Sequence, residues 1–283
     1  MDTPKRLFLF AGYDKNGIID DALIYYVSAL SKFGDVIVCM DSDCSKPETD
    51  KLKTYTIHTI AKRHGEYDFG SYKRCYQYAR DKKLLDKYDN VYLVNDSVFG
   101  PMFDMTNTIK NIEAKSTDAV GMIISKHKTH KFMESWFVKL NKNVFMTDWF
   151  DEFISSVQLQ PTKAKITIRY EHGLTNLIQN HNCSWGGLYT YRGRYTYNNP
   201  LGLFKHDCPF VKKASFIRHN GDCGKQIKYI LNHADFGAAL STIVSANRVY
   251  GENYMNWLLT GNPIKILMRK IKYMIQKIKN GKL

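Results

Sequence analysis

Short apolar runs and amphipathic stretches alternate through residues 1–100, and this alternation restricts the fold more than any other feature of the sequence. Four apolar runs predict strands, at residues 6–11, 35–40, 55–60 and 91–94. After Asp20, apolar residues recur at i, i+3, i+4 and i+7, and Ser71 can cap a second helix with a similar face. Strands that alternate with helices indicate an α/β fold, in which a mostly parallel sheet is flanked by helices.

The run 91–94 ends in the polar triplet Asn95-Asp96-Ser97, which the turn signal Gly100-Pro101 follows. Open α/β sheets bind ligands just beyond the carboxyl ends of their strands. An acid beside an amide at that point can hold a metal ion, a phosphate-linked sugar or a ribose. Asn95 and Asp96 could equally cap the next turn. The spacing alone leaves both interpretations open.

Further polar residues follow the other predicted strands, and the parallel arrangement places them at the same edge of the sheet. Acids in such a set suit chelation of a diphosphate through a divalent metal, with one carboxylate acting as general base. Arg63 and Lys73 carry positive charge that can neutralise phosphate, although a solvated helix surface would also contain such residues. The candidate substrate-binding residues of this edge are Gly12, Tyr13, Asp41, Asp43, Arg63, Tyr67, Asp68, Lys73, Asn95 and Ser97.

Several common sites are absent from the sequence. Neither a GxGxxG nor a GxxxxGK[ST] motif occurs, so acids and other side chains would have to hold a nucleotide. No Gly-x-Ser-x-Gly motif indicates an α/β-hydrolase, the six cysteines form no CxxC pair, and the histidines lack zinc-site spacing. No apolar run reaches the ~18 residues of a membrane span, and residues 7–11 are too short for a signal peptide. We therefore expect a cytoplasmic protein with reduced thiols.

The chain carries a formal net charge of +14, and its basic residues are densest at the C-terminus. Apolar residues in 264–283 fall on one helical stripe, and lysine and arginine occupy the rest of the predicted helix. Such a basic amphipathic helix suits the surface of an anionic membrane. The alternative is a helix that packs on its own domain with a solvated basic face. Nucleic acid is not an expected partner, because no nucleic-acid-binding module is recognisable.

Two blocks of the sequence resemble the rhamnan synthesis protein F family. They are Arg63 with residues 65–73 (Gly-Glu-Tyr-Asp-Phe-Gly-Ser-Tyr-Lys) and residues 93–101 (Leu-Val-Asn-Asp-Ser-Val-Phe-Gly-Pro). The resemblance extends in order over most of residues 5–220, through the segments 134–138, 141–145, 170–174, 199–200 and 209–212. The C-terminal helix lies outside it.

The resemblance implies a bacterial glycosyltransferase with a glycosyltransferase-A-like fold. Such an enzyme moves a sugar, with rhamnose as one candidate, from a nucleotide-sugar donor to a growing, lipid-linked surface polysaccharide (capsule, O-antigen or cell-wall rhamnan). By the same resemblance, Asp96 would hold the donor diphosphate or its Mg²⁺ or Mn²⁺ ion, and Glu171 would act as the base of an inverting reaction. Because Asn95 and Ser97 stand where the family motif class has acids, a metal requirement is an open question. His130, Glu134 and Trp136 complete the predicted substrate-binding set.

These expectations divide the chain into three parts. Residues 1–125 would bind the nucleotide sugar, 126–260 would form the acceptor side of the same catalytic domain, and 261–283 would associate with the membrane. Residues 183–215, rich in Gly, Tyr and Asn, would form a loop-dominated region that faces substrate. The protein would then be peripheral on the inner face of the cytoplasmic membrane. The alternative function is a non-catalytic carbohydrate-binding or scaffold protein of the same assembly machinery.

Overall fold

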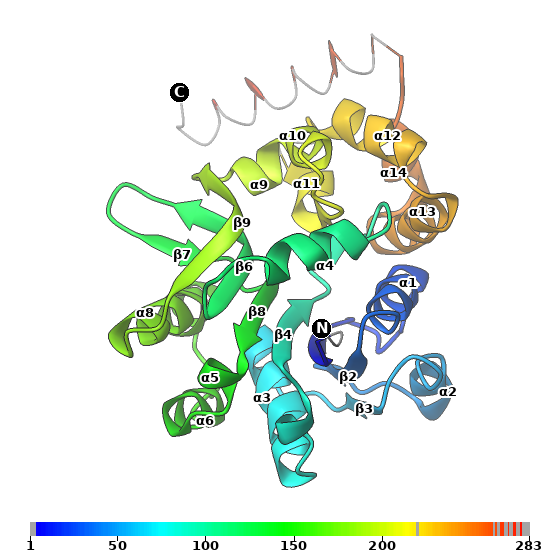
Figure 1. The fold of residues 1–283 in the computed structure, drawn as a ribbon. Coiled ribbons are helices and arrows are strands. Elements are labelled where there is room, and N and C mark those ends of the chain that lie inside the picture. Colours follow the sequence, from blue (N-terminus) through cyan, green and yellow to red (C-terminus); the bar gives the residue numbers. More distant parts are fainter. Residues whose placement is uncertain are drawn as a thin grey trace. The chain divides into compact units, whose positions relative to one another are not determined.

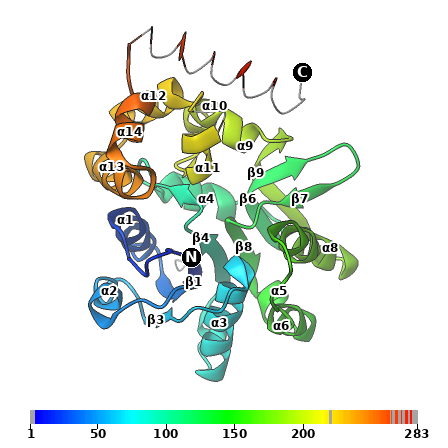
Figure 2. The same cartoon turned by 180° about the vertical axis from the view of Figure 1, so that it is seen from behind.

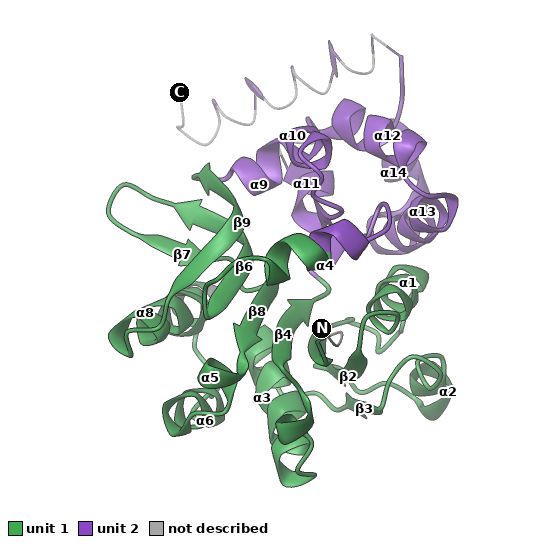
Figure 3. Ribbon diagram, in the orientation of Figure 1, with its two compact units in different colours: residues 1–96, 109–193 green, residues 97–108, 194–283 purple. Residues whose placement is uncertain are grey.

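A computed structural model describes residues 4–218 and 221–262, together with residues 264, 267, 268, 271, 274, 275 and 278. Its elements are labelled in Figure 1. The chain forms two compact units (Figure 3). Unit 1 contains residues 1–96 and 109–193, and unit 2 contains residues 97–108 and 194–283.

Unit 1 is built on an eight-stranded sheet in the order β3-β2-β1-β4-β8-β6-β7, with β9 paired to β6. The pairs β1–β2, β2–β3, β1–β4 and β6–β9 are parallel, whereas β8 pairs antiparallel with β4 and β6, as does β7 with β6. The strands are β1 (Arg6–Gly12), β2 (Asp35–Met40), β3 (His58–Ala61), β4 (Asn90–Asn95), β6 (Ala119–Lys126), β7 (Lys131–Met133), β8 (Phe137–Asn141) and β9 (Trp185–Arg192).

Helices cover both faces of this sheet (Figures 1 and 2). Side chains of β1, β2 and β4 alternate between them: Leu9 packs in the cluster formed with α3, α6 and α8, while the ring of Phe10 meets that of Tyr26 of α1 at 5.3 Å. The helical segments are α1 (Asp21–Leu30), α2 (Lys46–Asp50), α3 (Tyr67–Asp81), a 3-10 turn (Leu85–Lys87), α5 (Lys142–Phe145), α6 (Asp148–Ser155), α7 (Lys163–Ile166), a π-helical turn (Thr167–His172) and α8 (Gly173–Asn180).

Local sequence explains where these elements begin. The Asp20 carboxylate accepts a hydrogen bond of 3.0 Å from the backbone N–H of Leu23, which caps α1 as predicted. The central strands are apolar without alternation because both of their faces are buried under helices. Both β2 and β3 lie on one side of β1, and β4 lies on the other. The carboxyl ends of β1 and β4 therefore flank the point at which strand order reverses, where α/β sheets bind their ligands.

Unit 2 is mainly helical. A two-stranded antiparallel ribbon joins β5 (Val98–Phe99) to β10 (Val211–Lys212). Helix α4 (Thr106–Glu113) begins in unit 2 and ends in unit 1. Further helices of unit 2 are α9 (Tyr195–Asn198), α10 (Pro200–Lys205), α11 (Lys213–Ile217), α12 (Gly224–His233), α13 (Phe236–Tyr250) and α14 (Glu252–Leu258).

The predicted α/β class is confirmed, and three local expectations are wrong. The third strand begins at His58 rather than near residue 55. Helix α3 begins at Tyr67, so Ser71 lies inside the helix and does not cap it. Residues 185–192, predicted to be loop, form strand β9 inside the sheet.

The predicted C-terminal helix is only partly described. The described positions of 264–278 are helical, whereas the basic residues on which the prediction depends lie outside the described residues, namely Lys265, Arg269, Lys270, Lys272, Lys277 and Lys279. Among the residues that the structure describes, no helix is long and apolar enough to cross a membrane. The predicted division into donor, acceptor and membrane parts stays a prediction.

Candidate functional site

Asp41, at the carboxyl end of β2, fixes the loop that follows β3. Its buried carboxylate oxygen Oδ1 accepts hydrogen bonds from the backbone N–H groups of His64 (2.7 Å) and Gly65 (2.8 Å). Gly65 has a φ of 75°, a conformation that glycine adopts without a steric penalty. The Arg63 guanidinium donates to the Asp41 carbonyl oxygen at 2.8 Å and lies 3.4 Å from Asp41 Oδ2. A predicted ligand-binding acid thus holds a second predicted binding residue in place.

Arg63 also connects the ends of β1 and β2. Its guanidinium carbon lies 4.9 Å from the centroid of the Tyr13 ring, and its backbone N–H donates to Asp43 Oδ1 at 3.0 Å. Half of the Tyr13 surface is exposed, so part of the ring beside this cation is accessible to a ligand. Gly12 serves packing instead, since a Cβ atom there would meet the Met40 sulfur at 2.4 Å.

The first turn of α3 meets the end of β4. Tyr67 has a φ of 58°, which is unusual for an aromatic residue and costs roughly 1–3 kcal/mol. The next residue, Asp68, accepts a hydrogen bond of 2.9 Å at Oδ2 from the buried side-chain amide of Asn95. Asp96 follows, its backbone N–H bonded to the Ala11 carbonyl at 3.1 Å and its side chain half-buried. The structure thus brings an acid, an amide and a second acid to the point where strand order reverses.

A buried tyrosine connects this group with Glu171. The Tyr72 hydroxyl donates to the Ser135 carbonyl at 2.9 Å, and Ser135 donates from its backbone N–H (2.9 Å) and its hydroxyl (3.1 Å) to Glu171 Oε1. Burial raises the pKa of Tyr72 well above its ordinary value, and the charge of Asp68 adds to the rise, while a hydrogen bond with Asn95 opposes it. Glu171 also contributes to this pKa. Asp68, Asn95 and Glu171 therefore all act on one hydroxyl group.

The sequence predicted Glu171 at the opening of a helix, and the structure places it in the π-helical turn between α7 and α8. Turns of this kind are rare and occur often at functional sites, because the extra residue displaces a side chain from the regular helical ladder. Ser135 fixes one carboxylate oxygen of Glu171 through two donors. The turn and Ser135 together orient the predicted base.

Other residues of the predicted substrate-binding set make their contacts in other parts of unit 1. The Lys73 ammonium donates to the Val157 carbonyl at 2.6 Å and lies 3.2 Å from Glu66 Oε2. Trp136 and Glu134 are buried and bonded to each other at 2.8 Å. His130 is exposed on the β6–β7 hairpin, and its ring lies 4.9 Å from that of His172. The Trp136 carbonyl also accepts a hydrogen bond of 3.2 Å from the backbone N–H of Asn95, so Trp136 borders the Asp68–Glu171 group through its main chain.

Sequence reasoning missed a buried cluster beneath the site. His64 Nε2 lies 3.0 Å from Ser71 Oγ, and its Nδ1 lies 3.6 Å from Asp41 Oδ1, which resembles a hydrolase triad. The backbone N–H of Glu66 donates to Nδ1 at 3.1 Å, so Nε2 carries the ring proton and cannot deprotonate Ser71. Hydrogen bonding from Cys75, aided by His64 and Ser71, lowers the pKa of the buried Cys39 thiol to about 6. The cluster anchors the loop above it.

Ser97 belongs to unit 2, where sequence reasoning missed its partner. The Lys212 ammonium donates to Ser97 Oγ at 3.0 Å and lies 5.7 Å above the Tyr197 ring. Lys212 is buried, although it belongs to one of the segments that carry the family resemblance. The family resemblance of residues 209–212 could have singled out Lys212 from the sequence. Its contact with Ser97 could not have been predicted, because it depends on the pairing of β5 with β10.

Acidic residues alone do not complete a cation site here. Within the described part of the chain, no group of three or more His, Cys, Asp or Glu residues is placed to hold a metal ion. Mg²⁺ takes about six oxygen ligands. Asp96 and its neighbours would supply a minority of them, so the side chains do not fit a metal without further oxygens from a ligand.

A family model described as rhamnan synthesis protein F matches residues 36–279. The expectation that the C-terminal segment lies outside the resemblance is therefore wrong, because the match extends to residue 279. No curated protein matches the chain. Among solved structures, a candidate nucleotide-diphospho-sugar transferase from Desulfovibrio desulfuricans G20 has 16% identity and a TM-score of 0.42, covering 90% of this chain and 99% of its own. Core-mannan synthase A from Aspergillus fumigatus, in a Mn/GDP form, has 12% identity and a TM-score of 0.32, covering 53% of this chain and 63% of its own.

Proposed function

Because the chain belongs to the rhamnan synthesis protein F family, we propose that it is a glycosyltransferase that moves a sugar from a nucleotide-sugar donor to a growing bacterial surface polysaccharide. The observation that carries the proposal is the group of hydrogen-bonded residues in unit 1. Asp68 and Asn95 lie at the point where strand order reverses, and the same buried tyrosine links them to Glu171. A binding group and a candidate base are thus held by one network.

The donor would occupy the carboxyl ends of β1, β2 and β4, in a glycosyltransferase-A-like arrangement. Its planar base would lie on the Tyr13 ring, beside the Arg63 guanidinium. Asp43 and Asp41 hold the backbone and side chain of Arg63, and so support the nucleoside side of the site. Asn95 and Asp96 would face the diphosphate and the sugar at the reversal point.

Transfer would proceed with inversion. Glu171 accepts the proton of the acceptor hydroxyl, the acceptor oxygen forms a bond to the anomeric carbon, and the bond from that carbon to the diphosphate breaks. Ser135 orients the Glu171 carboxylate for this role. Mg²⁺ or Mn²⁺, when bound, would supply charge stabilisation of the diphosphate, with Asp96 as one ligand and phosphate oxygens completing the shell.

We further propose that the acceptor is lipid-linked and that the protein works at the inner face of the cytoplasmic membrane. The exposed apolar positions of residues 264–278 support this location, because they offer a hydrophobic surface near the end of unit 2. Rhamnose is one candidate for the transferred sugar.

A thermal-shift screen of UDP-, GDP-, CMP- and dTDP-linked sugars, with and without Mn²⁺ or Mg²⁺, tests the donor site. We expect one nucleotide class to raise the melting temperature, because a ligand that binds the native state alone stabilises it. Release of the matching nucleotide (UDP, GDP, dTDP or CMP) in the presence of membrane extract would then demonstrate transfer. A flat screen would contradict the donor site, and donor binding without release would favour the non-catalytic alternative.

A further inference from the structure

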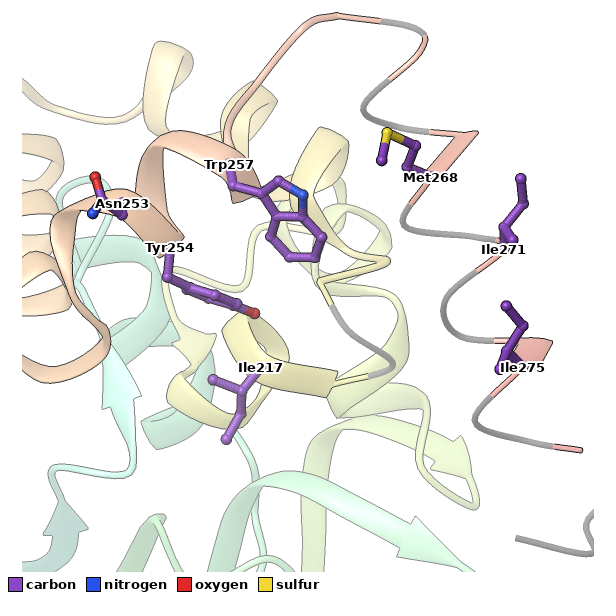
Figure 4. A pocket seen from close by; sticks show the side chains of 7 residues that line it. All are labelled: Ile217, Asn253, Tyr254, Trp257, Met268, Ile271 and Ile275. Atoms are coloured by element: carbon purple, nitrogen blue, oxygen red, sulfur yellow. The ribbon is translucent and has the colours of Figure 1, made fainter. Parts of the chain in front are cut away.

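Unit 2 contains an apolar groove that the proposed reaction does not use. Its lining comes from Ile217 at the end of α11, from Tyr254 and Trp257 of α14, and from Met268, Ile271 and Ile275 of the C-terminal segment. The groove has a volume of about 670 Å³, and Asn253 adds a polar amide to its lining. Figure 4 shows the two aromatic side chains of α14 on one side and the C-terminal segment on the other.

The C-terminal side of the groove continues into a longer apolar row. We call this row the C-terminal stripe; its described members are Ile264, Leu267, Met268, Ile271, Met274, Ile275 and Ile278. The exposed fractions of these residues range from 43% to 68%. Their spacing of three and four residues places them on one helical face. Soluble proteins rarely expose so many contiguous apolar side chains unless a partner covers them.

Charge identifies the kind of partner. Residues 264–283 contain seven lysine and arginine residues and no aspartate or glutamate. A second copy of the chain would oppose seven cations with seven cations, so like-charge repulsion disfavours that occupant. A bilayer of acidic phospholipids satisfies both properties of the segment, because its headgroups attract the cations and its acyl region receives the apolar side chains.

The aromatic residues of the groove support the same partner. Tryptophan and tyrosine gather where hydrocarbon meets water in membrane proteins, because each ring is apolar with one polar group. The Tyr254 hydroxyl donates to the Phe216 carbonyl at 2.7 Å, and Tyr254 also lines the groove. Trp257 lies on the same lining. The sequence segment 264–283 has no tryptophan, and α14 supplies one.

We propose that the groove and the C-terminal stripe dock unit 2 on the surface of an anionic phospholipid bilayer, with lipid acyl chains entering the groove beside Trp257. This docking extends the proposed function but does not depend on sugar transfer. It can be measured with vesicles alone, so a failure of the donor screen and a failure of docking are separate results.

The test is co-flotation of the full chain with vesicles of equal parts phosphatidylglycerol and phosphatidylcholine, compared with phosphatidylcholine alone. We expect strong binding to the anionic vesicles, weakening as salt is added. Ile271→Ser should lower the partition coefficient at least about tenfold, because it removes a buried branched side chain from the acyl region. Ile57→Ser is the matched control, since Ile57 in unit 1 and Ile271 are both 43% exposed.

A second readout reports on the groove itself. Phospholipids with brominated acyl chains should quench part of the tryptophan fluorescence of the bound protein, and Trp257→Phe should remove that part while binding is retained. Three results would overturn the proposal: equal binding to neutral and anionic vesicles, binding of Ile271→Ser that equals that of Ile57→Ser, or quenching that survives Trp257→Phe. A dimer in size-exclusion chromatography that Ile271→Ser abolishes would assign the surface to a second copy and would also overturn it.

Discussion

The side-chain amide of Asn95 donates a hydrogen bond of 2.9 Å to Asp68 Oδ2, joining the last residue of β4 to the first turn of α3. Asn95 is only 2% exposed, so the bond is partly buried and Asp68 is held at the end of the sheet. The two residues come from separate sequence blocks, both of which carry the family resemblance. Their contact gives those blocks a common physical role.

Asp68→Ala and Asn95→Ala should both weaken donor binding, and their effects should not add. A hydrogen bond to a charged group contributes about 1.5–3 kcal/mol, and each variant removes the same bond. We therefore expect each single variant to raise the donor KM by at least about tenfold, and the double variant to be little worse than either. Steady-state kinetics with the donor found in the screen provides the measurement. Fully additive losses would show that the two residues act independently.

Glu171→Gln should abolish transfer while donor binding is retained. The substitution keeps the size of the side chain and removes the carboxylate that accepts the acceptor proton. General-base catalysis contributes about 10²–10⁴-fold, so kcat should fall by that factor. Ser135→Ala is the companion variant, because it removes the hydroxyl donor to Oε1 but keeps the backbone N–H, and it should cause a smaller loss. Full activity of Glu171→Gln would eliminate this residue as the base.

Glu66 should make the stability of unit 1 sensitive to acid. Burial raises its pKa, but hydrogen bonds and charge from Arg74 and Lys73 outweigh burial and hold the pKa below the ordinary value of 4.5. Because the folded-state pKa is depressed, the contribution of Glu66 is fully present above pH 4.5 and is lost as the pH falls through the folded value.

Urea unfolding as a function of pH measures this contribution. Glu66→Gln should cost about 1–3 kcal/mol at neutral pH, because Arg74 loses an ion pair of 2.6 Å, and the cost should shrink in acid. Asp50→Asn is the control, since its pairing with Lys46 is exposed and should contribute about 0.5 kcal/mol or less. A cost for Glu66→Gln that is unchanged between pH 7 and pH 3 would contradict the assignment.

The elements that could be predicted are those whose signals are local. The strand 91–94 and the cap at Asp20 depend on nearby residues, and both formed as expected. Strand β9 was missed because Gly186 and Gly187 look like loop residues. In the structure Gly187 permits close packing, since a Cβ atom there would meet Ile124 Cγ1 at 2.6 Å. This close packing involves β6, a strand more than 60 residues away in the chain, so it could not be predicted from the residues near Gly187.

The candidate site was predicted as a set of residues but not as a network. Asp41, Asn95 and Asp96 could be predicted from their positions at strand ends, because the carboxyl ends of parallel strands lie at the same edge of the sheet. The link to Glu171 passes through Tyr72 and Ser135, which lie in two of the segments that carry the family resemblance. Their contact could not be predicted, because it joins residues 63 positions apart in the sequence. The π-helical turn was likewise invisible, because it is a deviation of the backbone from the helix that the apolar spacing predicts.

Lys212→Met should impair use of the donor by releasing Ser97, the residue that follows Asp96 in the chain. The Lys212 ammonium donates to Ser97 Oγ at 3.0 Å from a buried position, so its loss removes a charge-assisted hydrogen bond of about 1.5–3 kcal/mol. We expect a higher donor KM with a smaller change in kcat, and the same pattern for Ser97→Ala. Lys205→Met is the control, because the Lys205 ammonium lies 5.6 Å above the Tyr229 ring in the same unit and should leave kinetics unchanged. If Lys212→Met lowers kcat without raising KM, then Lys212 acts on the transition state rather than through Ser97, and the positioning role is wrong.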